Sequence, residues 1–228
     1  GNVRACVSGT PTYFTGTASQ STTTITGVGT TWTSAMVGQI FVFANGASAL
    51  ITGYTSATSF STSASYSQTV ASQNYNMYNA GNTVNTGAWA RVSCTFVAPS
   101  SGTLTNNSIF IRQTDATART FYIDNLSVTV NADVNHAVDG SVDDSTNFAT
   151  NWSAAPLGGT VTRTTSTLYD TSASAQVVTT ATVGHGLRNN MTIKPSVSTQ
   201  YLVTFYAKSS NTFSDIRVRY SRDGGTNF

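Results

Sequence analysis

The sequence has very little charge. It contains no glutamate and only two lysines, and charged residues occupy 9% of its 228 positions, whereas a typical globular domain carries about 25%. Because Glu, Lys and Leu are among the best helix formers, their scarcity argues against a helical protein. The formal net charge of +2 argues against a basic nucleic-acid-binding domain and against an acidic disordered tail. No run of 18 or more apolar residues occurs, so we predict no membrane insertion.

Hydroxyl side chains take the place of the missing charge. The chain contains 41 threonines and 29 serines, together with 10 tyrosines and 11 phenylalanines. Threonine, valine and the aromatic residues favour strands, and threonine also presents a hydroxyl group that water can solvate. The composition therefore predicts an all-β protein. It is typical of an extracellular, cell-surface or virion protein, and it argues against an ordinary intracellular enzyme.

The two cysteines, Cys6 and Cys94, are 88 positions apart and fit no metal-binding spacing. In an oxidising compartment they could form one disulfide that closes a long loop. The alternative is a pair of buried free thiols.

Residues 14–80 contain no Asp, Lys or Arg and alternate between strand-like runs and turn signals. A dense apolar strand is predicted at 39–44, an Asn45-Gly46 turn follows it, and a partner strand is predicted at 49–54. A strand is predicted at 22–26 with a turn at 27–29, and a short helical turn is predicted at 32–37. We expect a small β domain here, with a core drawn from Trp32, Met36, Ile40, Val42, Phe43, Leu50 and Ile51.

The remaining sections are predicted to form short strands at the spacing of a two-sheet sandwich. In the predicted strand 89–97 the core face would hold Ala90, Val92, Cys94 and Phe96. The other predicted strands are 108–113, 120–130, 160–165, 173–179, 186–193, 200–207 and 215–220. Residues 222–225 (RDGG) are typical of a hairpin turn, but no returning strand follows, which would leave an open sheet edge.

Four stretches together are similar to the jelly roll of carbohydrate-binding modules. They are YDTSASAQVVTT, TQYLVTFYAKS, GAWARVSCTF and ARTFYIDNLSVTV. In that family the first two precede the last two, whereas here the order is rotated. The resemblance implies a jelly-roll β-sandwich split between the two chain ends. Residues 1–13 and 81–130 would form the closing half, residues 131–228 the opening half, and residues 14–80 a small inserted Ser/Thr-rich β domain.

Similar jelly-roll repeats occur in giant repetitive bacterial surface proteins and in phage tail fibres. The rotated order leaves four arrangements open. The chain could be one repeat of a tandem array, it could complete the sandwich of the next unit by strand complementation, it could be a self-contained permuted domain, or it could consist of two unrelated small domains. The first two lead to self-association into a filament or array.

Catalytic signals are weak, and we expect no enzyme activity. No GxSxG elbow is present. The two histidines, His136 and His185, lie in separate sections, and the adjacent carboxylates Asp143 and Asp144 would point to opposite faces if they lay on a strand.

The same resemblance implies a structural Ca²⁺ between the opening loop and the closing strand. Carried over by position, its ligands would be Asp124, Asp139, Asp143 and Asp144. In the alternative interpretation Asp124 only accepts turn hydrogen bonds. No other cofactor is predicted.

Aromatic rings on an open sheet face could stack on sugar rings. The candidates for glycan binding are Trp89, Trp152, Tyr206 and Tyr220, with Tyr169 also available. The alternative is that these large side chains fill the core.

We therefore expect a non-enzymatic structural subunit or repeat of an extracellular filament, fibre or surface layer. The alternative function is a carbohydrate-binding adhesive module of a phage tail fibre or cell-surface protein. Outward aromatic residues that gather in an open groove would favour the second function.

Overall fold

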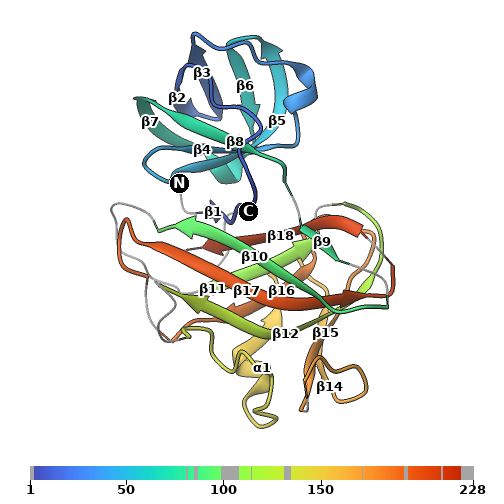
Figure 1. The fold of residues 1–228 in the computed structure, drawn as a ribbon. Coiled ribbons are helices and arrows are strands. Elements are labelled where there is room, and N and C mark those ends of the chain that lie inside the picture. The colour runs from blue at the N-terminus through green and yellow to red at the C-terminus, as the bar shows by residue number, and fades with distance from the viewer. Residues whose placement is uncertain are drawn as a thin grey trace.

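A computed structural model describes residues 3–80, 82–84, 87–98, 108–113, 115–130, 135–170, 172–192, 195–211 and 213–221. The fold is all-β, as predicted from the composition, with three antiparallel sheets. Two of the sheets face each other as a β-sandwich, and the third curls into a separate small domain (Figure 1). No helix among the described residues is long and apolar enough to cross a membrane.

The small domain is built on one sheet of seven strands in the order β7-β2-β3-β6-β5-β4-β8. The Asn45-Gly46 turn joins β4 to β5 as predicted, with Gly46 in the left-handed region at φ 78°. The strand predicted at 22–26 is shifted to β3, and the chain turns before it at Thr22-Thr23 and not at the predicted 27–29. The elements are β2 (Thr17–Thr22), β3 (Thr24–Val28), η1 (Ser34–Met36), β4 (Ile40–Phe43), β5 (Ser48–Ser56), β6 (Ser59–Thr62), η2 (Ala64–Tyr66), β7 (Gln68–Gln73) and β8 (Tyr75–Tyr78).

An aromatic cluster fills the core of the small domain. The Trp32 ring stacks on Phe60 with centroids 4.4 Å apart, and Phe41 stacks on Tyr75 at 4.3 Å. Phe41, which was absent from the predicted core, is fully buried, whereas Val42 is only partly buried. Alternation along β4 explains the exchange, since Phe41 and Phe43 share the inner face and Val42 faces outward.

Two sheets form the sandwich. Sheet A has the order β1-β18-β11-β16-β13, with β9 also paired to β18, and sheet B has the order β10-β17-β12-β15-β14. The elements are β1 (Val3–Ala5), β9 (Asn82–Val84), β10 (Ala90–Val97), β11 (Ser108–Gln113), β12 (Thr120–Thr129), α1 (Phe148–Asn151), β13 (Trp152–Ala154), β14 (Thr160–Thr164), β15 (Ser174–Val178), β16 (Gly186–Asn190), β17 (Gln200–Ser209) and β18 (Phe213–Ser221).

Strands from both predicted halves alternate in each sheet of this one chain. In sheet B, β17 lies between β10 and β12, and in sheet A, β11 lies between β16 and β18. Their inward side chains form one continuous core that contains Val92, Cys94 and Phe96 on the predicted face. Described strands from both predicted halves of this one chain therefore pair within the same two sheets. The hairpin turn predicted at residues 222–225 lies outside the described residues.

The predicted disulfide is present and joins Cys6 to Cys94, with the two Cα atoms 5.4 Å apart. Cys94 belongs to β10, and Cys6 directly follows β1. The bond therefore joins the beginning of the chain, which pairs with sheet A, to an edge strand of sheet B.

Residues 7–13, which we call the strap, connect the sandwich to the small domain and pair with both. Val7 exchanges two backbone hydrogen bonds of 2.9 Å with Thr95 of β10. Five residues later, the Thr12 N–H donates to the Met77 carbonyl at 2.7 Å, and the Met77 N–H donates to the Tyr13 carbonyl at 2.8 Å. The strap thus holds β8 of the small domain beside the edge of sheet B.

Side chains add further contacts between the small domain and sheet A. The Ala5 N–H donates to the Ser48 Oγ at 2.8 Å. The Arg219 guanidinium lies 5.2 Å from the centre of the Tyr66 ring, close enough for a cation–π interaction.

Candidate ligand-binding surface on sheet B

The strand register of sheet B places two rows of polar and aromatic residues on its outer face. In one row Arg91 of β10 lies opposite Tyr206 of β17, which lies opposite Asp124 of β12. In the next row Lys208 lies opposite Tyr122, which lies opposite Gln176 of β15. Because alternate residues such as Val92, Phe205 and Ile123 point into the core, these rows point away from it.

Three aromatic residues meet on this face, and we call Trp89, Tyr169 and Tyr206 the aromatic platform. The Tyr169 ring stacks on Tyr206 with centroids 3.5 Å apart and planes 15° apart. Trp89 meets Tyr169 edge-on at 5.9 Å. Tyr169 keeps 39% of its surface exposed. A hydrogen bond with the Tyr206 hydroxyl raises the pKa of Tyr169.

A buried carboxylate positions the outermost ring. Asp124 is fully buried, and its carboxylate accepts the Asn125 N–H at 2.8 Å and the Tyr169 N–H at 3.3 Å. These bonds attach the loop that carries Tyr169 to β12. A register shift after Asp124, with Asn125 at φ 49°, marks a β-bulge at this point. Burial raises the pKa of Asp124 to about 6.

Polar and charged groups lie on the same face of sheet B as the platform. Gln176 donates to the Tyr122 hydroxyl at 3.2 Å and accepts from Thr162 at 3.3 Å. Arg91 is exposed and Lys208 is half-buried.

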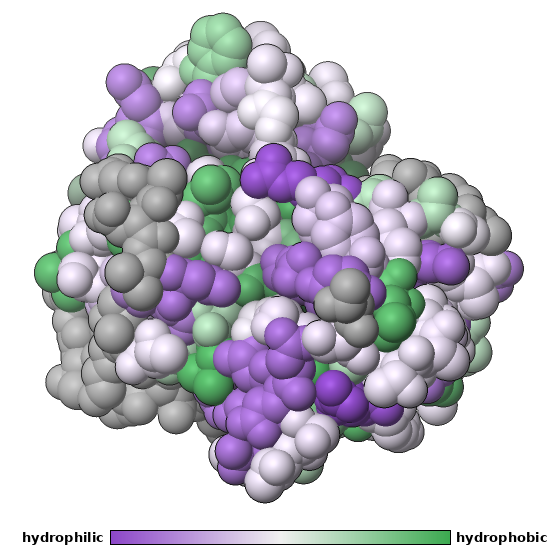
Figure 2. All heavy atoms as spheres, turned by 60° about the horizontal axis from the view of Figure 1, so that its bottom comes forward, coloured by the Kyte–Doolittle hydropathy of each residue, from purple (hydrophilic) through white to green (hydrophobic). Residues whose placement is uncertain are grey.

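Figure 2 shows the molecule with the α1 and β14 end of the sandwich turned toward the viewer. Hydrophilic side chains run across the middle of that view, and the hydrophobic ones are scattered between them.

The structure separates the aromatic residues that the sequence analysis considered together. Trp89 and Tyr206 meet on the platform. Trp152 and Tyr220 are 1% and 0% exposed and belong to the sandwich core, so the prediction that they bind a ligand is wrong. For these two the alternative interpretation, core packing, is correct. The sequence analysis did not include Tyr122. Alternation in the motif TFYIDN places its side chain on the other face of β12 from Phe121 and Ile123, and therefore outward.

The four aspartates carried over as calcium ligands do not fit a shared site. Among the described residues, no group of three or more Asp, His or Cys side chains is arranged to hold a metal ion. Asp124 is occupied by backbone N–H groups, as in the alternative interpretation. The other three lie in the 139–144 loop. There Asp139 accepts the Asp144 N–H at 3.1 Å, and hydrogen bonds from Ser172 and Ser141 lower the pKa of Asp143.

Comparisons with known proteins add no relative: no protein-family model, curated protein or solved structure matches the chain. The geometry of this surface is therefore the basis for assigning a function. Its exposed ring can cover an apolar ligand face, while neighbouring amide, hydroxyl and cationic groups can donate hydrogen bonds.

Proposed function

We propose that the chain is a non-enzymatic extracellular module that binds carbohydrate at the aromatic platform. The observation that carries this proposal is the meeting of Trp89, Tyr169 and Tyr206 on an outward sheet face. Sugar rings have apolar faces that stack on aromatic rings and hydroxyl groups that need hydrogen-bond partners at the edge. Gln176, Arg91 and Lys208 supply such partners. The disulfide supports an oxidising, extracellular location.

The test is affinity electrophoresis of the purified protein in gels that contain xylan, β-glucan, mannan or galacturonan. We expect retardation by at least one of these polysaccharides. Tyr169→Ala should weaken that binding by about tenfold or more, because it removes the exposed ring of the platform. Tyr54→Ala is the matched control, since Tyr54 is 41% exposed, like Tyr169, but belongs to the small domain. Unchanged mobility in every gel, or equal loss in both variants, would contradict the proposal.

A second candidate function is a structural subunit of an extracellular fibre. It is supported by the small domain, where Phe14 and Val28 are each 67% exposed on a segment without Asp, Lys or Arg. Uncharged surfaces with exposed apolar side chains favour lateral packing. Because strands of both predicted halves pair within one chain, we expect subunits to assemble through such surfaces and not by exchanging strands. Negative-stain microscopy should then show filaments, whereas a concentrated solution containing only 23.9 kDa monomers would exclude this function.

A further inference from the structure

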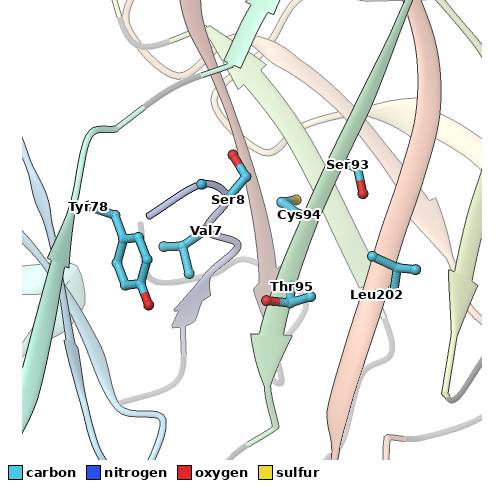
Figure 3. Close-up of a pocket in the computed structure, with 8 residues that line it drawn as sticks. Val7, Ser8, Tyr78, Ser93, Cys94, Thr95 and Leu202 are labelled. Atoms are coloured by element: carbon cyan, nitrogen blue, oxygen red, sulfur yellow. The ribbon is translucent and has the colours of Figure 1, made fainter. Parts of the chain in front are cut away.

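A groove lies where the strap, the small domain and the edge of sheet B meet. It consists of two hollows of about 270 Å³ and 210 Å³ that share Val7, Tyr78 and Thr95 in their walls. Figure 3 shows the larger hollow, with the Tyr78 ring on one side, Val7 beside it and Thr95 of β10 beyond. The groove is distinct from the aromatic platform, because none of the platform residues lines either hollow.

The walls of the groove are fixed before any ligand arrives. The strap pairs with β10 at Val7 and with β8 at Tyr13, and the disulfide fixes the residue before Val7. At the far end the β4–β5 turn packs closely on the sandwich. A Cβ added to Gly46 would lie 2.5 Å from the Val97 Cβ, so only glycine allows this approach. A preformed site avoids the entropic cost of ordering its walls when a ligand binds.

The lining, in the part of the chain that the structure describes, carries no charged side chain but is rich in hydrogen-bonding groups. No Asp, Lys, Arg or His is among the described residues that line the two hollows. Hydroxyl and amide side chains alternate there with apolar ones. Tyr78 supplies the accessible aromatic ring, since it is half-buried whereas Phe43 and Phe96 are buried in the two cores. The polar side chains are those of Ser8, Asn76, Ser93, Thr95 and Gln200.

Backbone groups of β10 add further hydrogen-bond donors and acceptors to the groove. Thr95 directs its N–H and carbonyl away from β17 and toward Val7. Because backbone groups alternate in direction along a strand, Ser93 and Val97 direct theirs to the same edge. The Val7–Thr95 bridge is isolated, and the ladder does not continue on either side of it. The edge at Ser93 and Val97 therefore meets the groove with both donors and acceptors.

We propose that this groove binds a short neutral saccharide of one or two sugar rings. An anionic or cationic ligand would find no counter-charge among the described lining residues, and a purely apolar ligand would leave the side chains of Asn76, Ser93, Thr95 and Gln200 without partners. A neutral sugar meets both requirements. Its ring can stack on Tyr78, and its hydroxyl groups can donate hydrogen bonds to the lining and accept hydrogen bonds from it. Each hollow is smaller than the roughly 300 Å³ at which sites for drug-sized ligands begin, which sets the limit of one or two rings.

The test is a titration of ¹⁵N-labelled protein with cellobiose, xylobiose, mannobiose and diacetylchitobiose, each to about 10 mM. We expect at least one disaccharide to shift the amide signals of Gly9, Ser93 and Asn76. Digalacturonate, which is charged, should leave them unchanged. Shifts confined to the platform would support the proposed function and overturn this inference, whereas shifts confined to the groove would do the reverse.

Two variants test the assignment of the site. Tyr78→Ala should weaken the binding about tenfold or more by removing the ring. Thr95→Val keeps the shape and the β10 ladder but removes one hydroxyl, so it remains informative if Tyr78→Ala does not fold. Tyr54→Ala serves as the control. Full affinity in both groove variants, binding of an extended tetrapeptide in place of every sugar, or no shift with any disaccharide would overturn the proposal.

Discussion

Asp124 is a carboxyl group enclosed between sheet B and the loop that carries Tyr169. Burial raises the pKa of Asp124 from 3.8, the value of an unperturbed Asp as in the unfolded chain, to about 6 in the folded chain. Between these values the folded chain binds a proton that the unfolded chain releases. The stabilising contribution of Asp124 is therefore fully present below pH 3.8 and is lost as the pH rises through about 6.

We expect Asp124→Asn to remove this pH dependence, because an amide does not titrate. Urea unfolding midpoints, measured from below pH 3.8 to above pH 6, should fall less steeply in the variant than in the parent. Asp143→Asn is the control. Hydrogen bonds lower the pKa of Asp143 in the fold, so this residue stabilises the native state at pH values above its ordinary pKa. Its replacement should therefore change the pH dependence of the unfolding midpoint in the opposite direction. Parallel curves for the parent and Asp124→Asn would refute the assignment.

Single aromatic residues could be placed from the sequence only in part. Alternation identifies the outward positions of a strand, and it correctly placed Trp89 outside the core. It gave no means of placing Trp152 and Tyr220, because their burial depends on which strands pair and which sheet covers them. Tyr169 reaches the platform through a loop held by Asp124, which is 45 positions away in the chain.

At the scale of an element, Gly186 at the start of β16 is tightly constrained by the neighbouring strand of sheet A. A Cβ there would lie 2.1 Å from the Ile111 carbonyl oxygen and 2.6 Å from the Arg112 Cα, both backbone atoms of β11. The two strands would have to separate to admit it. We expect Gly186→Ala to destabilise the sandwich by about 2 kcal/mol or more.

Gly53→Ala is the matched control in a strand of the small domain. Its nearest neighbour would be the Ser61 Cβ at 3.5 Å, an ordinary contact, and its backbone lies outside the left-handed region. Chemical denaturation followed by circular dichroism should separate the two variants. Equal stability would mean that β11 and β16 can move apart at little cost.

Most strands were predictable from the sequence, but their partners were not. The predicted strands 39–44, 49–54, 108–113 and 186–193 all correspond to observed ones, because alternation and turn residues are local signals. The constraint on Gly186 is not local, since β11 lies about 75 positions earlier in the chain. The β2–β3 turn at Thr22-Thr23 was missed because it lacks the glycine or asparagine that usually identifies a hairpin.

At the scale of the whole molecule, the chain has two separate hydrophobic cores and one disulfide, which lies in the sandwich. Replacing both cysteines (Cys6→Ala with Cys94→Ala) should cost the sandwich on the order of 4 kcal/mol, because the disulfide closes a long loop in the unfolded chain. The melting temperature of the sandwich should fall on the order of 10 °C.

The small domain has its own aromatic core, so its unfolding should shift much less. Calorimetry would show this as one transition that moves and one that stays. If both transitions move together, the disulfide stabilises the molecule through the strap and not only within the sandwich.

The chain enters the small domain through the strap and leaves it at Tyr78, and the position of these two connections has a further consequence. The segments that lead into and out of the small domain line the same hollow, so the two covalent connections between the small domain and the sandwich lie close together. Replacing residues 14–77 with another domain of similar end spacing would leave every strand pair of the sandwich intact. Such a graft would exchange one wall of the groove and remove the packing of Gly46 on Val97, but it would leave the aromatic platform in place. The wall of the groove could therefore be changed without changing the residues of the aromatic platform.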